Sequence, residues 1–505
     1  MTHLPALPVL VPLATAALCF AAWKQVRAQR VAAIAGAAAL LGVGIRLLSV
    51  TLEEGTIVAR IGAWPAPFGI TLAADVLSAV MVLLTGLMGL AVTIYSLADI
   101  DAPRQGHGFF PFLFLMLTGI SGSFVTADIF NLYVWFEVML IGSFALLALG
   151  GERNQLEGAM KYVTLNLVGS SIFLAGTGIL YSVVHTLNMG DLSVRLAEIA
   201  TTRPNLVLAL SAMFLVSFGI KAGLFPLYFW LPASYATPPA AVSAVFAGLL
   251  TKVGVYTLIR VFVVVFPIMD RNFSILLVLA GLTMILGVFG AVSQFEIRKI
   301  LSFHIISQIG YMTAALGLVA NPDPAVRRLA LVAAVFYIAH HIVVKTNLFL
   351  VGGVIRAMRG TYDLTHLGGI KNAAPWLAVL FLIPAFSLAG IPPLSGFWAK
   401  LAVIRAGFEA GQYLLIAAAL VAGVLTLVSM IKIWNEAFLK PDPEAGPCEP
   451  LSRRRWLAMT VPIAALALIT IAIGVWPQAL FEVAERAADQ LLDLETYRRI
   501  VGGAP

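Results

Sequence analysis

The chain has 505 residues, of which 60% are apolar and only 11% are charged, and its net charge is +7. Soluble proteins contain about 25% charged residues, and even a large globule needs polar groups to cover its surface, so this composition excludes a soluble enzyme. The basic residues are scattered over loops instead of forming a patch, which argues against nucleic-acid binding.

Long apolar runs predict an all-α polytopic membrane protein. A helix needs about 20 mostly apolar residues to cross a bilayer, and the alternating pattern of membrane β-strands is not found in the sequence. The length rule therefore predicts about fourteen transmembrane helices. In chain order they lie near residues 5–22, 31–51, 74–97, 109–126, 129–149, 161–184, 205–228, 240–264, 274–293, 300–320, 328–354, 374–407, 412–432 and 456–476.

The two ends of the chain need separate interpretations. No basic segment precedes the first apolar run, so we interpret this run as a first span and not as a cleaved signal peptide. After the last span, residues 481–494 turn polar but keep apolar residues at helical spacing. This pattern predicts an amphipathic helix lying on the membrane or on a partner. The distant cysteines Cys19 and Cys448 predict neither a disulfide nor a metal site.

The distribution of Lys and Arg sets the expected orientation. If the basic loop 24–30 is cytoplasmic, the basic segments 298–299 and 453–455 are cytoplasmic too. Both termini then lie outside.

Two of the predicted spans are interrupted by glycine and proline. The first break lies in residues 218–226 and is followed by prolines up to Pro239, and the second lies in residues 389–400. Proline removes a backbone donor and clashes with the preceding turn, and non-helical backbone at membrane depth is tolerated only where it is buried in protein or lines a wet cavity. Two breaks five spans apart, each carrying a lysine, indicate an internal inverted repeat. We expect helices 1–3 in residues 1–108, a first inverted five-helix repeat in 109–264, a second in 274–435, and the last helix with the amphipathic tail in 436–505.

Several ionisable residues lie inside these spans. Glu137 is well inside the fifth span, where a charge costs about 3 kcal/mol on insertion scales, although a neutral glutamic acid bonding a neighbouring helix would also fit. Lys221, Lys252, Lys345 and Lys400 all occupy membrane segments. Snorkelling toward the interface would explain Lys345 or Lys400, but it explains Lys252 poorly, because apolar or small residues surround it on both sides. Charge within a membrane is functional by default, so we interpret the set as a row that passes protons.

Histidines extend this row. His304 follows a cytoplasmic turn, and His340 and His341 lie in the middle of a span. His341 and Lys345 are four residues apart and share a helix face, and imidazole titrates near neutral pH, as a relay requires. His340 fits a satisfied core histidine equally well. Ser307 and Gln308 would bond either channel water or adjacent helices.

No motif for chemistry on a substrate accompanies the row. The sequence has no P-loop, dinucleotide fingerprint, Cys/His metal spacing or nucleophile with a base. We therefore expect a transporter and not an enzyme, with no cofactor, and the sequence does not define a metal.

The segments that carry these residues resemble the antiporter-like subunits shared by respiratory complex I, membrane hydrogenases and Mrp-type multisubunit Na⁺/H⁺ antiporters. The resemblance covers nearly the whole chain, and residues 62–69, 128–137 and 187–192 are most similar to D subunits of the Mrp group. The main segments are Phe136-Glu137, Ile220-Lys221 with Pro226, Trp230 to Pro232, Pro238-Pro239, Thr251 to Tyr256, His304 with Ser307 to Tyr311, His341 to Lys345 with Leu348 to Leu350, and Pro393 to Lys400.

This resemblance implies a fold, residue roles and partners. The fold would be fourteen helices with two inverted five-helix repeats and a broken helix in each. Glu137 and Lys221 would form an ion pair, Lys252 would be the central relay and Lys400 the exit-side lysine. A connecting hydrated axis would contain His304, His341 and Lys345. The chain would move protons as one subunit of a Na⁺/H⁺ antiporter complex in a prokaryotic plasma membrane. A proton-pumping subunit of a redox complex and a purely structural scaffold are the alternatives.

Overall fold

The computed structural model describes residues 3–441 and 451–502. Within these residues, twelve helices are long and apolar enough to cross a membrane, and two shorter apolar helices span Phe109–Val125 and Pro375–Ala389. Together they correspond one to one with the predicted spans. The all-α polytopic membrane fold is therefore confirmed.

The N-terminal helices are followed by a small β-hairpin that was not predicted from the sequence. The hairpin connects the second and third helices, and its strands pair in antiparallel register from Ile57 with Ala74 to Arg60 with Thr71. It is confined to a connection outside the spans, so the membrane part stays helical. The elements are α1 (Leu7–Ala21), α2 (Val26–Glu54), β1 (Ile57–Arg60), β2 (Thr71–Ala74), α3 (Val76–Asp99) and α4 (Ala102–Gly106).

Two successive stretches of helices make up the middle of the chain. The first contains α5 (Phe109–Val125), α6 (Ile129–Ala148), α7 (Arg153–Val184), α8 (Met189–Thr202), α9 (Pro204–Ala222), α10 (Trp230–Tyr235), α11 (Ala240–Val245) and α12 (Thr251–Arg260). Wide π turns at residues 246–250 and 261–265 extend α11 and α12 into one continuous span. The second contains α13 (Asp270–Ser293), α14 (Ile297–Gly317), α15 (Pro324–Arg359), α16 (Ile370–Ala373), α17 (Pro375–Ala389), α18 (Ser395–Glu409) and α19 (Tyr413–Ile433).

Three spans form the core of the bundle. In the most apolar window of each span, 100% of residues are buried for 240–265, 89% for 297–320 and 94% for 324–359, against 33% for α2 and for 413–439. A helix that is apolar all round must be surrounded by other helices. The central position therefore belongs to α12, α14 and α15, which carry most of the predicted ionisable residues.

The two breaks have the same local structure. Helix α9 is capped by Gly223 (φ +81°), and α17 is capped by Gly390 (φ +92°). In each case the glycine N–H donates to the carbonyl four residues earlier, and the N–H of the next residue donates to that same carbonyl. This cap requires a left-handed residue, which favours glycine. The matching caps agree with a duplicated helix pair, while the boundaries of the inverted repeats stay a prediction.

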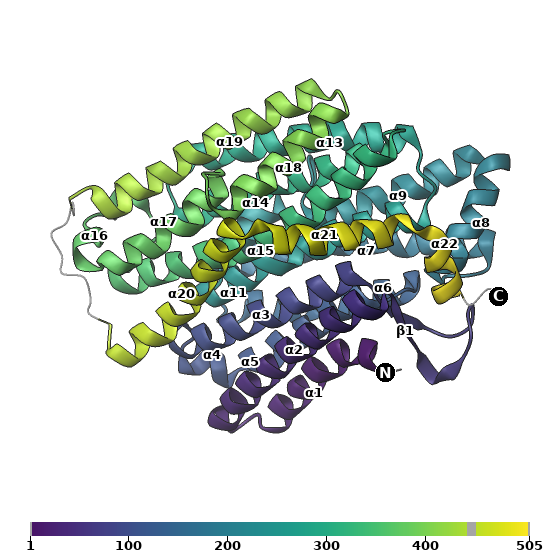
Figure 1. The fold of residues 1–505 in the computed structure, drawn as a ribbon. Helices are drawn as coiled ribbons and strands as arrows, with labels where there is room; N and C mark the ends of the chain where they lie inside the picture. Colours follow the sequence, from purple (N-terminus) through teal and green to yellow (C-terminus); the bar gives the residue numbers. More distant parts are fainter. Residues whose placement is uncertain (1–2, 442–450, 503–505) are drawn as a thin grey trace.

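The C-terminal helices cross one face of the bundle (Figure 1). They are α20 (Arg453–Val475), α21 (Pro477–Leu492) and α22 (Leu494–Tyr497). The predicted amphipathic helix is confirmed as α21, and its buried apolar residues pack on this chain. Phe481 stacks on Phe336 of α15 at 4.3 Å between ring centroids, and Arg328 of α15 pairs with Asp489 at 2.6 Å.

Candidate functional site

Lys252 lies in the middle of the bundle on α12. Its side chain is 0% exposed, and its Nζ donates to the main-chain carbonyl of Ala247. Ala247 belongs to the π turn that directly precedes α12 in the same continuous span. The span that carries the amine therefore also supplies its acceptor.

Helices α14 and α15 place further polar groups in the same core. The Nζ of Lys345 donates to the carbonyl of Leu301 at 3.0 Å. The Nε2 of His304 is hydrogen-bonded to the Ser429 hydroxyl of α19 at 2.6 Å. Both ring nitrogens of His341 are buried without a partner among the described residues. Since a neutral imidazole has one donor and one acceptor nitrogen, this ring can receive a proton without first breaking a hydrogen bond.

Two neighbouring polar residues on α14 have different environments. Ser307 donates to the carbonyl of Met284 on α13 at 2.9 Å, which is the helix-bonding role that the sequence left open. The Oε1 of Gln308 accepts a hydrogen bond from Tyr337 at 2.5 Å, while its Nε2 has no partner among the described residues. Gln308 is therefore the residue of the two with a free donor.

Lys400 lies against the second break. Its Nζ donates at 2.8 Å to the carbonyl of Ala389, in the last turn of α17, and lies 5.3 Å from the centre of the Tyr311 ring. The last carbonyls of a helix have no partner within the helix and attract cations. Lys400 follows the second break in the sequence, but its side chain points back and contacts the helix end before that break.

His340 is tied to the same break. Its Nδ1 is hydrogen-bonded to the Ser395 hydroxyl at 2.9 Å, and that hydroxyl is hydrogen-bonded to the Ser387 hydroxyl at 2.9 Å. Ser387 and Ser395 lie on either side of the break, on α17 and α18. This serine pair connects α15 with both halves of the broken helix. The pair was not predicted from the sequence, because serines in apolar spans are common helix contacts.

Lys221 and Glu137 lie near each other without touching. Lys221 is 3% exposed, its Nζ donates to the Ser170 hydroxyl at 3.1 Å, and it lies 5.0 Å from the centre of the Phe136 ring. Glu137 is half-buried, and its Oε1 is buried without a partner among the described residues. The direct ion pair implied by the family resemblance is therefore not formed in this structure.

None of the four lysines has an acidic partner within 4.0 Å in the described part of the chain. Three of them donate to main-chain carbonyls and one to a hydroxyl. A carboxylate partner would strongly favour the charged amine, whereas a carbonyl accepts an N–H from either the ammonium or the neutral amine. The arrangement therefore suits groups that change protonation state.

One buried ion pair was not singled out from the sequence. Arg260, at the end of α12, donates to both carboxylate oxygens of Asp75, the residue that precedes α3, at 2.5 and 2.8 Å, and the two side chains are 4% and 3% exposed. Burial alone would raise the pKa of Asp75, but the Arg260 guanidinium holds that pKa below its ordinary value. The sequence did contain a signal for this pair, which is an arginine inside an apolar span. A charge at that depth needs a partner of opposite charge.

Comparisons with known proteins find relatives that match nearly the whole chain. The sequence model of the family described as NADH:quinone oxidoreductase/Mrp antiporter, transmembrane, matches residues 126–426. The chain is 43% identical to the D subunit of the Na⁺/H⁺ antiporter of Alkalihalophilus pseudofirmus and 37% identical to that of Bacillus subtilis, covering 98% of this chain and 99% of each relative. It also superposes on a chain of the Mrp complex from Dietzia sp. DQ12-45-1b with a TM-score of 0.91, 32% identity and full coverage of both chains.

Proposed function

Because the chain belongs to the NADH:quinone oxidoreductase/Mrp antiporter family, we propose that it is the proton-translocating subunit of a multisubunit Na⁺/H⁺ antiporter in a bacterial plasma membrane. The observation that carries this proposal is the set of lysines buried at the core and at both breaks without acidic partners. The antiporter, and not a redox complex, is favoured because relatives at 43% and 37% identity are antiporter subunits. The matched complex I chain is only 22% identical and shares the fold alone.

Protons would move along the row by exchange between neutral and protonated groups. Lys221 takes a proton at the first break, Lys252 passes it through the centre, and Lys400 releases it at the second break. His304, His341 and Lys345 lie on the central helices α14 and α15 and would complete the connection. The orientation with both termini outside stays part of this proposal, as does the role of each residue.

Glu137 would bring protons to the row from the outer surface of the helix bundle. On α6 it lies between Phe130, Val134, Ile141 and Phe144, which are 46, 36, 58 and 37% exposed. An apolar stripe of this kind faces lipid or another membrane helix. A half-buried carboxylate in its middle is compensated best when a partner subunit covers the stripe. Glu137 would then exchange protons both with Lys221 and with that partner.

Glu137→Ala and Lys221→Ala are each expected to lower Na⁺-dependent proton movement about 100-fold, because each removes a proton-transfer group. The measurement is the Na⁺-dependent pH change in membrane vesicles that contain the assembled complex and receive no redox substrate. Glu157→Ala, at an exposed ion pair with Lys161, serves as the matched control and should transport normally. Wild-type exchange in both test variants, with the complex assembled, would contradict the proposal.

His340 would link the central helices to Lys400 through the serine pair. Ser395→Ala removes the hydroxyl that joins His340 to Ser387, and we expect transport to fall about fivefold to tenfold, the effect of losing one hydrogen bond worth about 1 kcal/mol. Ser395→Thr keeps a hydroxyl and should restore most of the rate. If alanine and threonine behaved alike, the hydroxyl would have only a packing role.

A further inference from the structure

A cavity of about 370 Å³ opens at one end of the bundle, away from the lysine row. It lies where α13, α15 and α19 begin and where α14 and α18 end. In a membrane bundle, a level at which five helices begin or end is the boundary between lipid and water. Exposed Trp and Tyr residues mark such boundaries, and Tyr413, which follows the cavity-lining Gln412, is 68% exposed.

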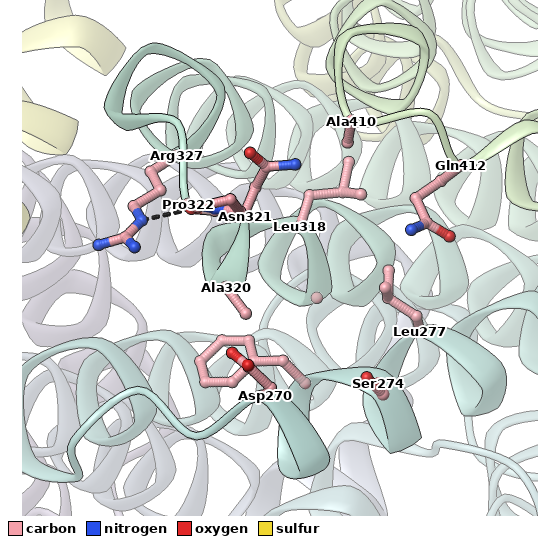
Figure 2. A pocket seen from close by; sticks show the side chains of 12 residues that line it. Asp270, Ser274, Leu277, Leu318, Ala320, Asn321, Pro322, Arg327, Ala410 and Gln412 are labelled. Carbon is pink, nitrogen blue, oxygen red and sulfur yellow. Dashed lines mark hydrogen bonds between the residues drawn. The ribbon is translucent and has the colours of Figure 1, made fainter.

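The cavity presents opposite charges on separate walls. Figure 2 shows Asp270 and Arg327 on different sides of the space, with the Asn321 and Gln412 amides also around it. Asp270 has no hydrogen-bond or ion-pair partner among the described residues, and it does not pair with Arg327. The Nε of Arg327 donates to the carbonyl of Asn321 at 2.5 Å, which orients the guanidinium and leaves its terminal nitrogens available. Both charges are thus free to bind a ligand.

Apart from Ser274, the rest of the cavity wall is apolar. Phe273, Leu277 and Leu318 line it, and Phe273 and Leu318 are each only 2% exposed. Below the cavity, the outer face of α13 continues as an apolar stripe, with Ile275 44% and Val278 63% exposed. If a ligand placed a charged end in the cavity, its remaining part would therefore meet the apolar surface of α13.

We propose that this cavity binds the headgroup of a zwitterionic phospholipid with a primary ammonium, such as phosphatidylethanolamine. The ammonium would donate to the Asp270 carboxylate, the phosphate would accept from Arg327, and the acyl chains would lie along α13. The volume is within the range of about 300–1,000 Å³ for small-molecule sites. An anionic phosphatidylglycerol offers nothing cationic to Asp270, and the choline of phosphatidylcholine has no N–H to donate. This inference is independent of the proton row.

Competition between lipids tests the proposal. The intact complex is placed in nanodiscs containing equal amounts of phosphatidylethanolamine, phosphatidylglycerol and phosphatidylcholine, and the lipids retained after extraction are identified by native mass spectrometry. We expect phosphatidylethanolamine to be enriched. Asp270→Asn and Arg327→Gln should each reduce that enrichment about fivefold, as expected for one partly exposed charge-assisted contact.

Matched controls keep the result interpretable. Glu54→Gln and Arg271→Gln remove one exposed charge of each sign outside the cavity and should leave the enrichment unchanged. Size-exclusion chromatography of each variant checks that the complex is assembled. Equal retention of the three lipids, or an enrichment that survives both test variants, would overturn the proposal. So would a photo-crosslinker at Gln412 that captures a protein subunit and no lipid.

Discussion

Lys252→Met should abolish transport, lowering Na⁺-dependent proton movement about 100-fold or more, the size expected for loss of a general acid–base group. The lysine is fully buried and its Nζ contacts a carbonyl of its own span, so methionine fits the volume and removes only the amine. Folding should be preserved, because replacing a buried charge by an apolar side chain of similar size is often neutral or stabilising. Exchange in vesicles and assembly of the complex are both measured.

Lys252→Arg tests whether transport needs proton release by residue 252 or only a positive charge there. Arginine keeps a positive group at this position but does not release its proton in proteins. It should therefore transport as poorly as methionine does. Lys161→Met removes an exposed lysine paired with Glu157 and is the matched control with normal activity. If Lys252→Met transported normally, the chain would act as a scaffold and the row would have no role in conduction.

The membrane spans were the most predictable part of the fold. Each is specified by a local property, the length of an apolar run, and all fourteen positions agree with the helices. The β-hairpin at residues 57–74 was not foreseen because short strands in a connection carry no such signal. The docking of α21 was also missed. Its amphipathic pattern indicates that one face is covered, but lipid, a partner and the same chain all satisfy that pattern.

The residues of the site were recognised by type, but their contacts were not. A lysine in an apolar span is visible in any sequence, whereas its partner depends on how helices pack. Thus Lys400 contacts the break that precedes it, and Lys221 contacts Ser170 and not Glu137. Three of the four acceptors are main-chain carbonyls, and main-chain groups have no sequence signature.

The buried pair of Asp75 and Arg260 leads to the largest expected loss of stability. Arg260→Met leaves the carboxylate buried without its partner, and breaking a buried pair in this way costs about 3–5 kcal/mol. The double variant Asp75→Asn with Arg260→Met removes both charges. Because asparagine can still accept the hydrogen bond that Asp75 now accepts from the Ser78 N–H at 2.8 Å, we expect the double variant to recover most of that loss.

Thermal unfolding of the purified subunit in detergent at pH 7 compares the variants. The folded-state pKa of Asp75 is lowered, so the stabilisation by the pair is complete above the unfolded-state pKa of about 3.9. It is lost only as the pH falls through the still lower folded-state pKa. At pH 7 the full effect is therefore measured. Glu157→Gln breaks the exposed pair with Lys161 and should cost less than about 1 kcal/mol. Two results would contradict this prediction: equal losses of stability for the buried and exposed pairs, or a double variant no more stable than Arg260→Met. Either would show that Arg260 does not offset the cost of burying the Asp75 charge.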